Sequence, residues 1–241
     1  MSTDWRIAGV VNGIAYRELG RNRDIVLVHG LGMSSEYFVR FARALADRGW
    51  SPIAPDLRGP ATPQEHARML AAWADALGIR DAVWVGHSLG CNAVAHLPVR
   101  KKVFIGPLWT RRNPARLLPL LFIDIYRERL ALLFHVARAY VRYGVFQWFA
   151  TFRRYRDDLH RDPPDGRMIA GDRDPLPDRA YIPNLRFVRG AHACHFTSPR
   201  ETALLATEPA LDDVAEHQHD QSDEQRDHGH DPLPGAARDA E

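Results

Sequence analysis

Short apolar runs alternate along the chain with longer amphipathic segments. Eight runs have the length and residue types of β-strands: residues 5–10, 14–18, 24–28, 51–54, 82–85, 102–106, 167–171 and 185–188. Asn12-Gly13 joins the first two runs and is typical of a tight hairpin turn. Helical segments separate most of the later runs. This alternation predicts a mostly parallel eight-stranded α/β sheet with helices on both faces and ligands at the carboxyl ends of its strands.

Two helices near the start of the chain have clear boundary signals. One is expected over residues 34–48, with Ser34 or Ser35 as its N-cap. The other is expected over residues 62–77, where it opens with Thr-Pro-Gln-Glu. A glycine follows each helix and provides a stop signal.

One long helical pattern interrupts the alternation between residues 107 and 161. Apolar residues recur there every three or four positions from Phe122 to Val141, and charged residues face the other way. The segment holds 11 basic and four acidic residues, a balance that would suit an anionic surface or membrane. A solvated face is the simpler interpretation, because no lipid anchor accompanies it. We expect an amphipathic helical insertion.

Composition and charge predict one folded domain followed by a tail. At 241 residues with 45% apolar residues, the chain can bury one substantial core. Residues 1–206 carry a net charge of +11 and residues 207–241 a net charge of −9. The tail lacks apolar periodicity, so we expect it to be disordered from about residue 210. Metal binding by its four histidines is the weaker alternative, since their spacing fits no ordered site.

Targeting and redox signals are few. The first 11 residues lack a signal-peptide pattern, and no stretch approaches 18 uninterrupted apolar residues. The two cysteines, Cys91 and Cys194, have neither a disulfide framework nor metal-ligand spacing. We expect a soluble cytoplasmic protein with two free thiols, no metal, no integral membrane segment and no nucleic-acid partner.

The candidate chemistry centres on Gly86-His87-Ser88-Leu89-Gly90, which lies between a strand run and a helix-compatible stretch. A serine lifted off the end of a strand must adopt an unfavourable backbone conformation, and its neighbours two residues away must be nearly side-chain-free. Gly86 and Gly90 meet that demand. Ser88 is therefore the candidate nucleophile, although it could instead merely cap its helix.

Two further motifs precede this one. They are His29-Gly30-Leu31-Gly32 and Pro55-Asp56-Leu57-Arg58-Gly59, each following a short apolar strand. In this order, the three motifs resemble the α/β-hydrolase family over residues 5–205. The resemblance implies an α/β-hydrolase core formed by residues 1–106 and 162–206, a helical lid formed by residues 107–161, and residues 207–241 as an appended tail. It also implies that the lid's apolar face walls the substrate pocket.

A serine nucleophile needs a histidine base and a carboxylate that orients this base. The family's Gly-x-x-Asp pattern after the seventh strand selects Asp174, with Asp172 as the reserve. The family's histidine loop after the last strand selects His192, with His195 as the reserve. The chain order Ser88, Asp174, His192 is the order that α/β-hydrolases use.

The remaining site residues surround this candidate triad. Backbone N–H groups of Leu31 and Leu89 are expected to form the oxyanion hole. Met33 and Trp109 flank the expected pocket, where either could touch substrate or belong to the core. We expect His29 and Asp56 to support their turns.

The function that these residues indicate is cofactor-independent serine hydrolysis of a small, largely apolar ester, thioester or related acyl compound through an acyl-enzyme. Hydrolysis of carbon–carbon bonds, of the meta-cleavage type, is the closest chemical alternative, because residues 106–116 and 127–128 also look like that branch of the family. A haloalkane dehalogenase would need an aspartate at position 88. A non-catalytic binding protein is the rival of another class, since only ten residues join Asp174 to the last strand, where the family normally has a helix.

Overall fold

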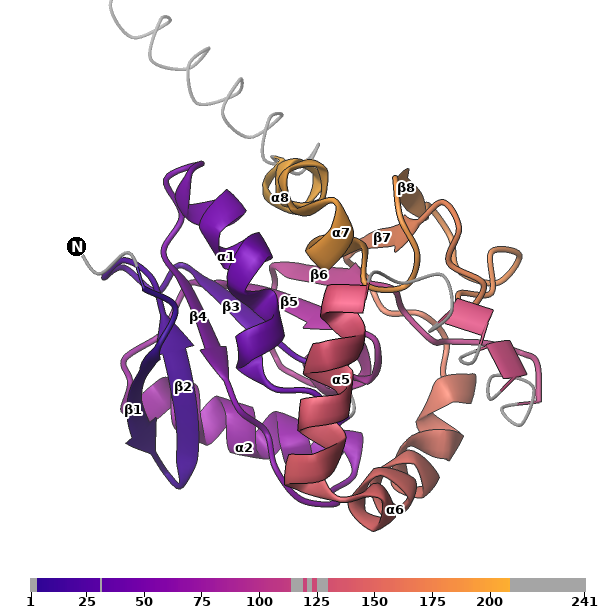
Figure 1. The fold of residues 1–241 in the computed structure, drawn as a ribbon, viewed down its shortest axis with the longest axis horizontal. Helices are drawn as coiled ribbons and strands as arrows, with labels where there is room; N and C mark the ends of the chain where they lie inside the picture. The colour runs from indigo at the N-terminus through magenta and orange to yellow at the C-terminus, as the bar shows by residue number, and fades with distance from the viewer. Residues whose placement is uncertain (1–3, 31, 114–118, 121–122, 125–129, 209–241) are drawn as a thin grey trace, which may run out of the picture. The chain divides into compact units, whose positions relative to one another are not determined.

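The computed structural model describes residues 4–30, 32–113, 119–120, 123–124 and 130–208 (Figure 1). Residues Met1–Ala206 form one compact unit, and Thr207–Glu241 form a second. The predicted disordered tail, from about residue 210, lies outside the described residues.

Eight strands form one sheet, as the sequence predicts. They are β1 (Ile7–Val11), β2 (Ile14–Glu18), β3 (Ile25–Val28), β4 (Pro52–Pro55), β5 (Val83–His87), β6 (Lys102–Ile105), β7 (Arg167–Gly171) and β8 (Arg186–Val188). Their order is β1-β2-β4-β3-β5-β6-β7-β8. Strand β2 pairs antiparallel with β1 and β4, and all other pairs are parallel. The carboxyl ends of β3 and β5 to β8 therefore meet at one edge of the sheet.

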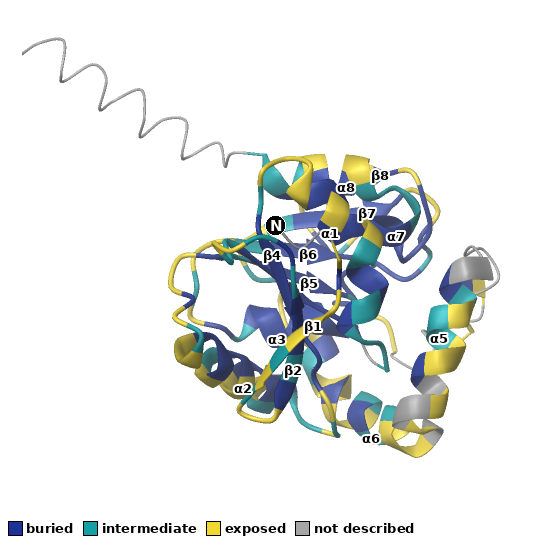
Figure 2. Cartoon of the chain, turned by 60° about the vertical axis from the view of Figure 1, so that its left-hand side comes forward, coloured by how far each residue is buried: buried dark blue, intermediate teal, exposed yellow. Residues whose placement is uncertain are grey.

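Helices cover both faces of the sheet (Figures 1 and 2), because successive strand residues point to opposite sides. In β3, Leu27 belongs to the core on the side of α1, whereas Val26 belongs to the core on the side of α2 and α3. The helices that contribute to these two cores include α1 (Val39–Ala46), α2 (Pro63–Ala76), α3 (Leu89–Ala95), α7 (Cys194–Thr197) and α8 (Pro199–Thr207), and Leu132 of the insertion joins the first core. The central strands are consequently buried on both faces, which explains their continuous apolar runs.

Local signals account for several element boundaries. Asn12 and Gly13 have φ angles of 51° and 75°, which close the β1–β2 hairpin as predicted. Thr62 caps α2 by accepting from the Glu65 backbone N–H at 3.2 Å, and the Glu65 carboxylate accepts from the Thr62 N–H at 2.7 Å. This reciprocal pair leaves two fewer unsatisfied donors at the start of α2.

The predicted serine cap before α1 is wrong. A 3₁₀ turn (η1, Ser35–Phe38) precedes α1, and the Ser34 side chain makes no capping hydrogen bond. The Ser35 hydroxyl accepts instead from the buried Arg17 guanidinium at 2.6 Å, and its N–H donates to Asp56. Tertiary hydrogen bonds thus outcompete the local cap.

From residue 130 onwards, the helical pattern of the insertion is divided between two helices. Helix α5 (Leu130–Tyr143) ends at Gly144, whose φ is 79°, and α6 (Val145–Tyr155) leads into a 3₁₀ turn (η3, Arg156–His160). A left-handed glycine ends a helix without the steric cost that other residues incur. The prediction that the apolar residues of the insertion face the substrate pocket is also wrong for Phe134 and Val141 of α5, which are exposed to solvent.

The two edges of the sheet are irregular. At one edge, β1 contains a β-bulge between Ile7 and Gly9. At the other, β8 has only three residues, and residues 172–185, which connect it to β7, contain no helix. The family's usual helix at this place is missing, as the sequence indicates.

Candidate functional site

Ser88 occupies a strained turn between β5 and α3. Its φ and ψ are 55° and −126°, a region that costs a non-glycine residue about 1–3 kcal/mol. The flanking glycines are sterically required: a Cβ on Gly86 would lie 2.7 Å from the Cys91 Cα, and one on Gly90 would meet the Val28 carbonyl oxygen. Ser88 makes no side-chain capping bond to α3. The strained serine therefore does not cap α3, and its hydroxyl is not used in a capping hydrogen bond.

Asp174 and His192 form a buried pair beside this turn. Asp174 follows β7 and His192 follows β8, and Asp174 Oδ2 lies 2.8 Å from His192 Nδ1. The other Asp174 oxygen accepts from the Leu176 N–H at 2.9 Å, and the side chain is fully shielded from solvent. The backbone N–H of His192 donates to Asp124 at 2.9 Å. Both carboxylate oxygens of Asp174 are thus held in fixed positions.

The two reserve residues have other surroundings. Asp172 is half exposed, and its carboxylate accepts from the Gly190 N–H at 2.9 Å, which closes the turn before the histidine loop. His195 is fully buried against Tyr37, Phe38 and His87, and burial lowers its pKa to about 3. Neither residue takes part in the Asp174–His192 pair.

The end of β6 contacts both the serine turn and the His192 ring. The Ser88 N–H donates to the Ile105 carbonyl at 2.9 Å. The next residue, Gly106, has a φ of 56°, and a Cβ there would lie 2.9 Å from both Cε1 and Nδ1 of His192. The His192 ring therefore packs on the backbone directly beside the residue to which Ser88 is bonded. Only glycine leaves room for this ring.

A buried hydrogen-bond chain connects three loops around Ser88. The Gly30 N–H donates to the Tyr37 hydroxyl at 3.1 Å, and this hydroxyl lies 2.7 Å from His87 Nδ1. His87 Nε2 lies 3.1 Å from the His192 carbonyl oxygen, which can only accept. The tautomer follows: Nε2 carries the proton, and the Tyr37 hydroxyl donates to Nδ1. Burial keeps His87 neutral by holding its pKa well below the ordinary value.

The turn after β3 is held by a second histidine. His29 Nδ1 lies 2.8 Å from the Gly30 carbonyl, and its Nε2 accepts from the Leu57 N–H at 2.9 Å. Burial lowers the pKa of His29, so the ring is a neutral support for this turn. Asp56 accepts from Ser35 and from the Arg17 guanidinium, which lies 3.3 Å away. Both residues have the supporting positions that we expected.

A cavity of about 50 Å³ lies over the turn after β3 and the start of α3. Its walls come from the core (His29, Gly30, Gly32, Met33, Leu57, Gly59, His66, Leu89, Gly90) and from α6 (Gln147, Trp148, Thr151, Tyr155). Met33 lines it, and so does Leu89, whose backbone N–H is the expected oxyanion donor, whereas Leu31 lies outside the described residues. The expectation for Trp109 needs correction: its ring is fully buried against Phe104, with centroids 5.1 Å apart, and does not line the cavity.

His66 and Tyr155 join the insertion to the core at this cavity. His66 Nδ1 lies 2.6 Å from the Tyr155 hydroxyl, and both residues are buried. Burial lowers the pKa of His66 to about 4, so the ring is neutral near pH 7. Sequence reasoning missed this pair, as it missed Tyr37 and His87. Only the position of His87 inside the serine motif could have signalled one of them.

Among the residues that the structure describes, no three His, Cys, Asp or Glu side chains gather as metal ligands would. Within the same residues, no helix is both long enough and apolar enough to span a bilayer.

Comparisons with known proteins give curated relatives that match part of the chain. The chain is 35% identical over 95 residues to the pimeloyl-[acyl-carrier protein] methyl ester esterase of Vibrio cholerae, covering 38% of this chain and 37% of that protein. It is 35% identical over 136 residues to a non-heme haloperoxidase of Rhodococcus erythropolis, covering 48% and 49%. The chain thus spans less than half the length of these curated relatives.

Solved structures share the fold. An alpha/beta hydrolase fold protein from Burkholderia ambifaria superposes with a TM-score of 0.66 at 19% identity, covering 85% of this chain and 98% of that one. A bromoperoxidase from Bacillus anthracis superposes with a TM-score of 0.61, also at 19% identity, covering 80% and 94%. The model of the alpha/beta hydrolase family matches residues 25–239. With the sheet order and the serine turn described above, this match shows that the chain belongs to the alpha/beta hydrolase family.

Proposed function

We propose that this chain is a serine hydrolase that cleaves small, largely apolar esters or related acyl compounds through an acyl-enzyme. The observation that carries the proposal is the buried Asp174–His192 pair, 2.8 Å apart, beside the strained Ser88 turn. A histidine held by a buried carboxylate is the base that a serine hydroxyl needs near neutral pH.

The proposed reaction has two halves. In the first, the Ser88 oxygen bonds to the acyl carbon while His192 Nε2 takes the hydroxyl proton, and Asp174 stabilises the imidazolium. The bond to the leaving alcohol then breaks, and His192 returns the proton to its oxygen. In the second half, His192 deprotonates a water that attacks the acyl-enzyme, and Ser88 leaves with the proton.

Backbone donors would stabilise the negative oxygen of each tetrahedral intermediate. The Leu89 N–H lies at the start of α3, directly after Ser88, and the Leu31 N–H is the second donor that the family resemblance implies. Two fixed donors act without reorganisation, and losing one typically costs about 10²- to 10³-fold in kcat. The hydrogen bond from Gly30 to Tyr37 supports the loop that would carry the second donor.

We take the cavity as the acyl site because Leu89, which follows Ser88, lines it, although Ser88 and His192 are not among its described lining residues. Its size favours a short acyl group. Its volume is about 50 Å³, and one water needs about 10–15 Å³ by the same measure, so it holds the equivalent of a few waters. Met33, Leu57 and Trp148 give it apolar walls. The methyl ester esterase among the relatives supports ester cleavage, although its chain is matched over only 37% of its length.

A fluorophosphonate probe and a panel of p-nitrophenyl esters of graded acyl length test the proposal. We expect the probe to label the peptide that contains Ser88, and the Ser88→Ala variant to lose labelling and turnover while keeping its thermal stability. Losing a serine nucleophile typically costs about 10⁶-fold in kcat.

A matched control variant and three possible outcomes separate this proposal from its alternatives. Ser198→Ala removes a hydroxyl that bonds only the Arg189 carbonyl at the protein surface, and it should leave labelling intact. Full esterase activity in Ser88→Ala, in a preparation free of host enzymes, would show that the nucleophile assignment is wrong. A wild-type chain that is neither labelled nor active would point to a binding protein, and turnover confined to a meta-cleavage product would point to carbon–carbon hydrolysis.

A further inference from the structure

The corner between α5 and α6 exposes apolar side chains that the core does not need. Val141 is 89% exposed and Phe146 is 91% exposed, and these two residues flank the turn at Gly144. Phe149, one helical turn further along α6, is 51% exposed. We call Val141, Phe146 and Phe149 the lid corner. Single exposed apolar residues are ordinary, but a cluster at a projecting turn marks an interaction surface.

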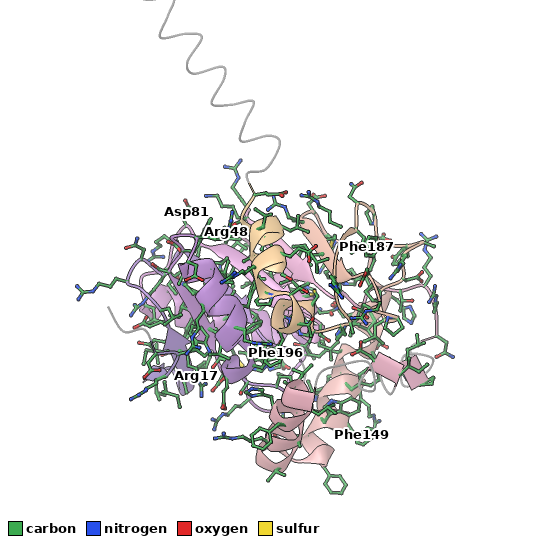
Figure 3. The ribbon with its side chains drawn as sticks, turned by 45° about the horizontal axis from the view of Figure 1, so that its top comes forward. Arg17, Arg48, Asp81, Phe149, Phe187 and Phe196 are labelled. Carbon is green, nitrogen blue, oxygen red and sulfur yellow. The ribbon has the colours of Figure 1, made fainter. Side chains whose placement is uncertain are left out.

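The exposure follows from how α6 is turned. Successive residues are about 100° apart around a helix. Trp148, Thr151 and Tyr155 therefore share one side of α6, which lines the cavity. Phe146 and Phe149 lie on the opposite side. One short helix thus presents apolar residues to the cavity and to solvent, and Figure 3 shows Phe149 projecting from the outer side of the insertion.

Helix α5 shows the same arrangement. Its buried residues Leu132 and Ala139 face the core. Phe134 is 69% exposed and, with Val141 two turns later, lies on the other side. Both helices of the insertion consequently place apolar residues on faces that have no cover among the described residues.

Exposed arginines lie on the same two helices as the lid corner, and one of them, Arg154, also interacts electrostatically with Glu65 of α2. Arg153 and Arg154 are exposed in the last turn of α6, and Arg156 follows. Arg138 on α5 and Arg156 have acidic neighbours at 3.4 Å, Glu36 and Asp157, but these ion pairs are solvent-exposed and therefore weak. The whole insertion, residues 107–161, has 11 basic and four acidic residues.

We propose that the lid corner docks on an anionic lipid bilayer surface, with the apolar side chains entering the headgroup region and the arginines contacting lipid phosphates. Projecting aromatic residues rimmed by positive charge are the features that bind a helix to such an interface. A second copy of the chain fits less well, because a symmetric contact would bring the arginines of both copies together. Docking through the outer side of α6 would leave its cavity side facing away from the lipid, while holding the chain at a surface in which apolar acyl compounds dissolve; this last step rests on the proposed function, whereas the docking does not.

Co-sedimentation with sucrose-loaded vesicles tests the docking. The full chain carrying Ser88→Ala is used, so that turnover cannot alter the lipid. We expect it to bind vesicles of phosphatidylcholine with a quarter phosphatidylglycerol much more strongly than pure phosphatidylcholine, and added salt should weaken this binding. Adding Val141→Ser and Phe146→Ser should lower binding about tenfold or more. Replacing Arg153 and Arg154 with glutamine should lower it about fivefold for each arginine.

The matched control is Phe187→Ser, which removes an exposed phenylalanine from β8, outside the insertion (Figure 3). It should leave vesicle binding unchanged. Thermal melts, and hydrolysis of a soluble ester by the corner variant with Ser88 restored, show that the variant is folded. Three results would overturn the proposal: no binding to anionic vesicles at low salt, equal binding by the corner variant, or self-association that the corner substitutions abolish without any vesicle binding. Fluorophosphonate labelling of the chain with Ser88 restored reports separately on the proposed chemistry.

Discussion

Replacing Asp174 with asparagine should nearly abolish turnover, because it changes which nitrogen of the neutral His192 ring carries the proton. The Asp174 oxygen Oδ1 accepts from the Leu176 N–H at 2.9 Å, so the carbonyl oxygen of an asparagine would remain at that position. The amide nitrogen would then occupy the Oδ2 position, 2.8 Å from His192 Nδ1. Because that nitrogen can only donate, Nδ1 must accept, and the ring proton moves to Nε2. A base protonated at Nε2 cannot take the proton of Ser88.

The expected loss is large. The wrong tautomer in a serine triad costs about 10⁴-fold in kcat. At about 1.36 kcal/mol for each factor of ten, this raises the barrier by about 5.4 kcal/mol. The fold should tolerate the change, because asparagine has nearly the same shape as aspartate and keeps the bond to Leu176.

Asp172→Asn is the matched control, two residues away. Its oxygen accepts only the Gly190 N–H at 2.9 Å among the bonds described, and an asparagine carbonyl can do the same. We expect activity within about threefold of wild type, as for most half-exposed substitutions. Steady-state kinetics on both variants, with circular dichroism to verify folding, gives the comparison. Equal and small losses would refute the reasoning, since neither carboxylate would then orient the histidine.

Two further predictions concern buried groups around the site. Tyr37→Phe removes the hydroxyl between Gly30 and His87 and leaves two buried polar groups without their partner. It should lower the free energy of unfolding, measured by urea denaturation, by about 2–4 kcal/mol and should also lower kcat. Unchanged stability would mean that water replaces the hydroxyl. Acid should destabilise the fold, because burial lowers the pKa of His66 to about 4 and that of His195 to about 3, while the unfolded chain binds these protons near pH 6.5. The free energy of unfolding is therefore highest above pH 6.5 and falls as the pH drops towards 4, by about 2 kcal/mol for each histidine at pH 5. Equal melting temperatures at pH 7.5 and pH 5 would contradict this prediction.

The sequence predicts those parts of the fold that depend on local chemistry. The eight apolar runs and the Thr62 cap are visible because burial on both faces and helix capping impose their own residue patterns. The serine turn is visible because its backbone forces glycines on both sides. Strand periodicity could not separate Asp174 from Asp172, since both lie in one turn, and only the family's Gly-x-x-Asp spacing favoured Asp174. Only the tertiary structure shows which carboxylate faces His192.

The serine cap before α1 was expected from local pattern, whereas a distant partner decides it, because the Ser35 hydroxyl accepts from Arg17 of β2. The break between α5 and α6 is local and lies at Gly144. Trp109 packs on Phe104, five positions earlier, which is the core alternative that the sequence left open. Single hydrogen bonds in the chain through Tyr37 join residues up to 105 positions apart, so no short stretch of sequence contains both partners.

The irregular edges of the sheet also bear on how the protein behaves in concentrated solution. An exposed edge strand offers unpaired N–H and C=O groups to any other strand, and this is a common route to aggregation. Here β8 offers only three residues, and the bulge between Ile7 and Gly9 breaks the pairing geometry of β1. A neighbouring molecule therefore finds no long, flat edge on which to extend the sheet. Pairing of sheets between two molecules is consequently disfavoured at both described edges.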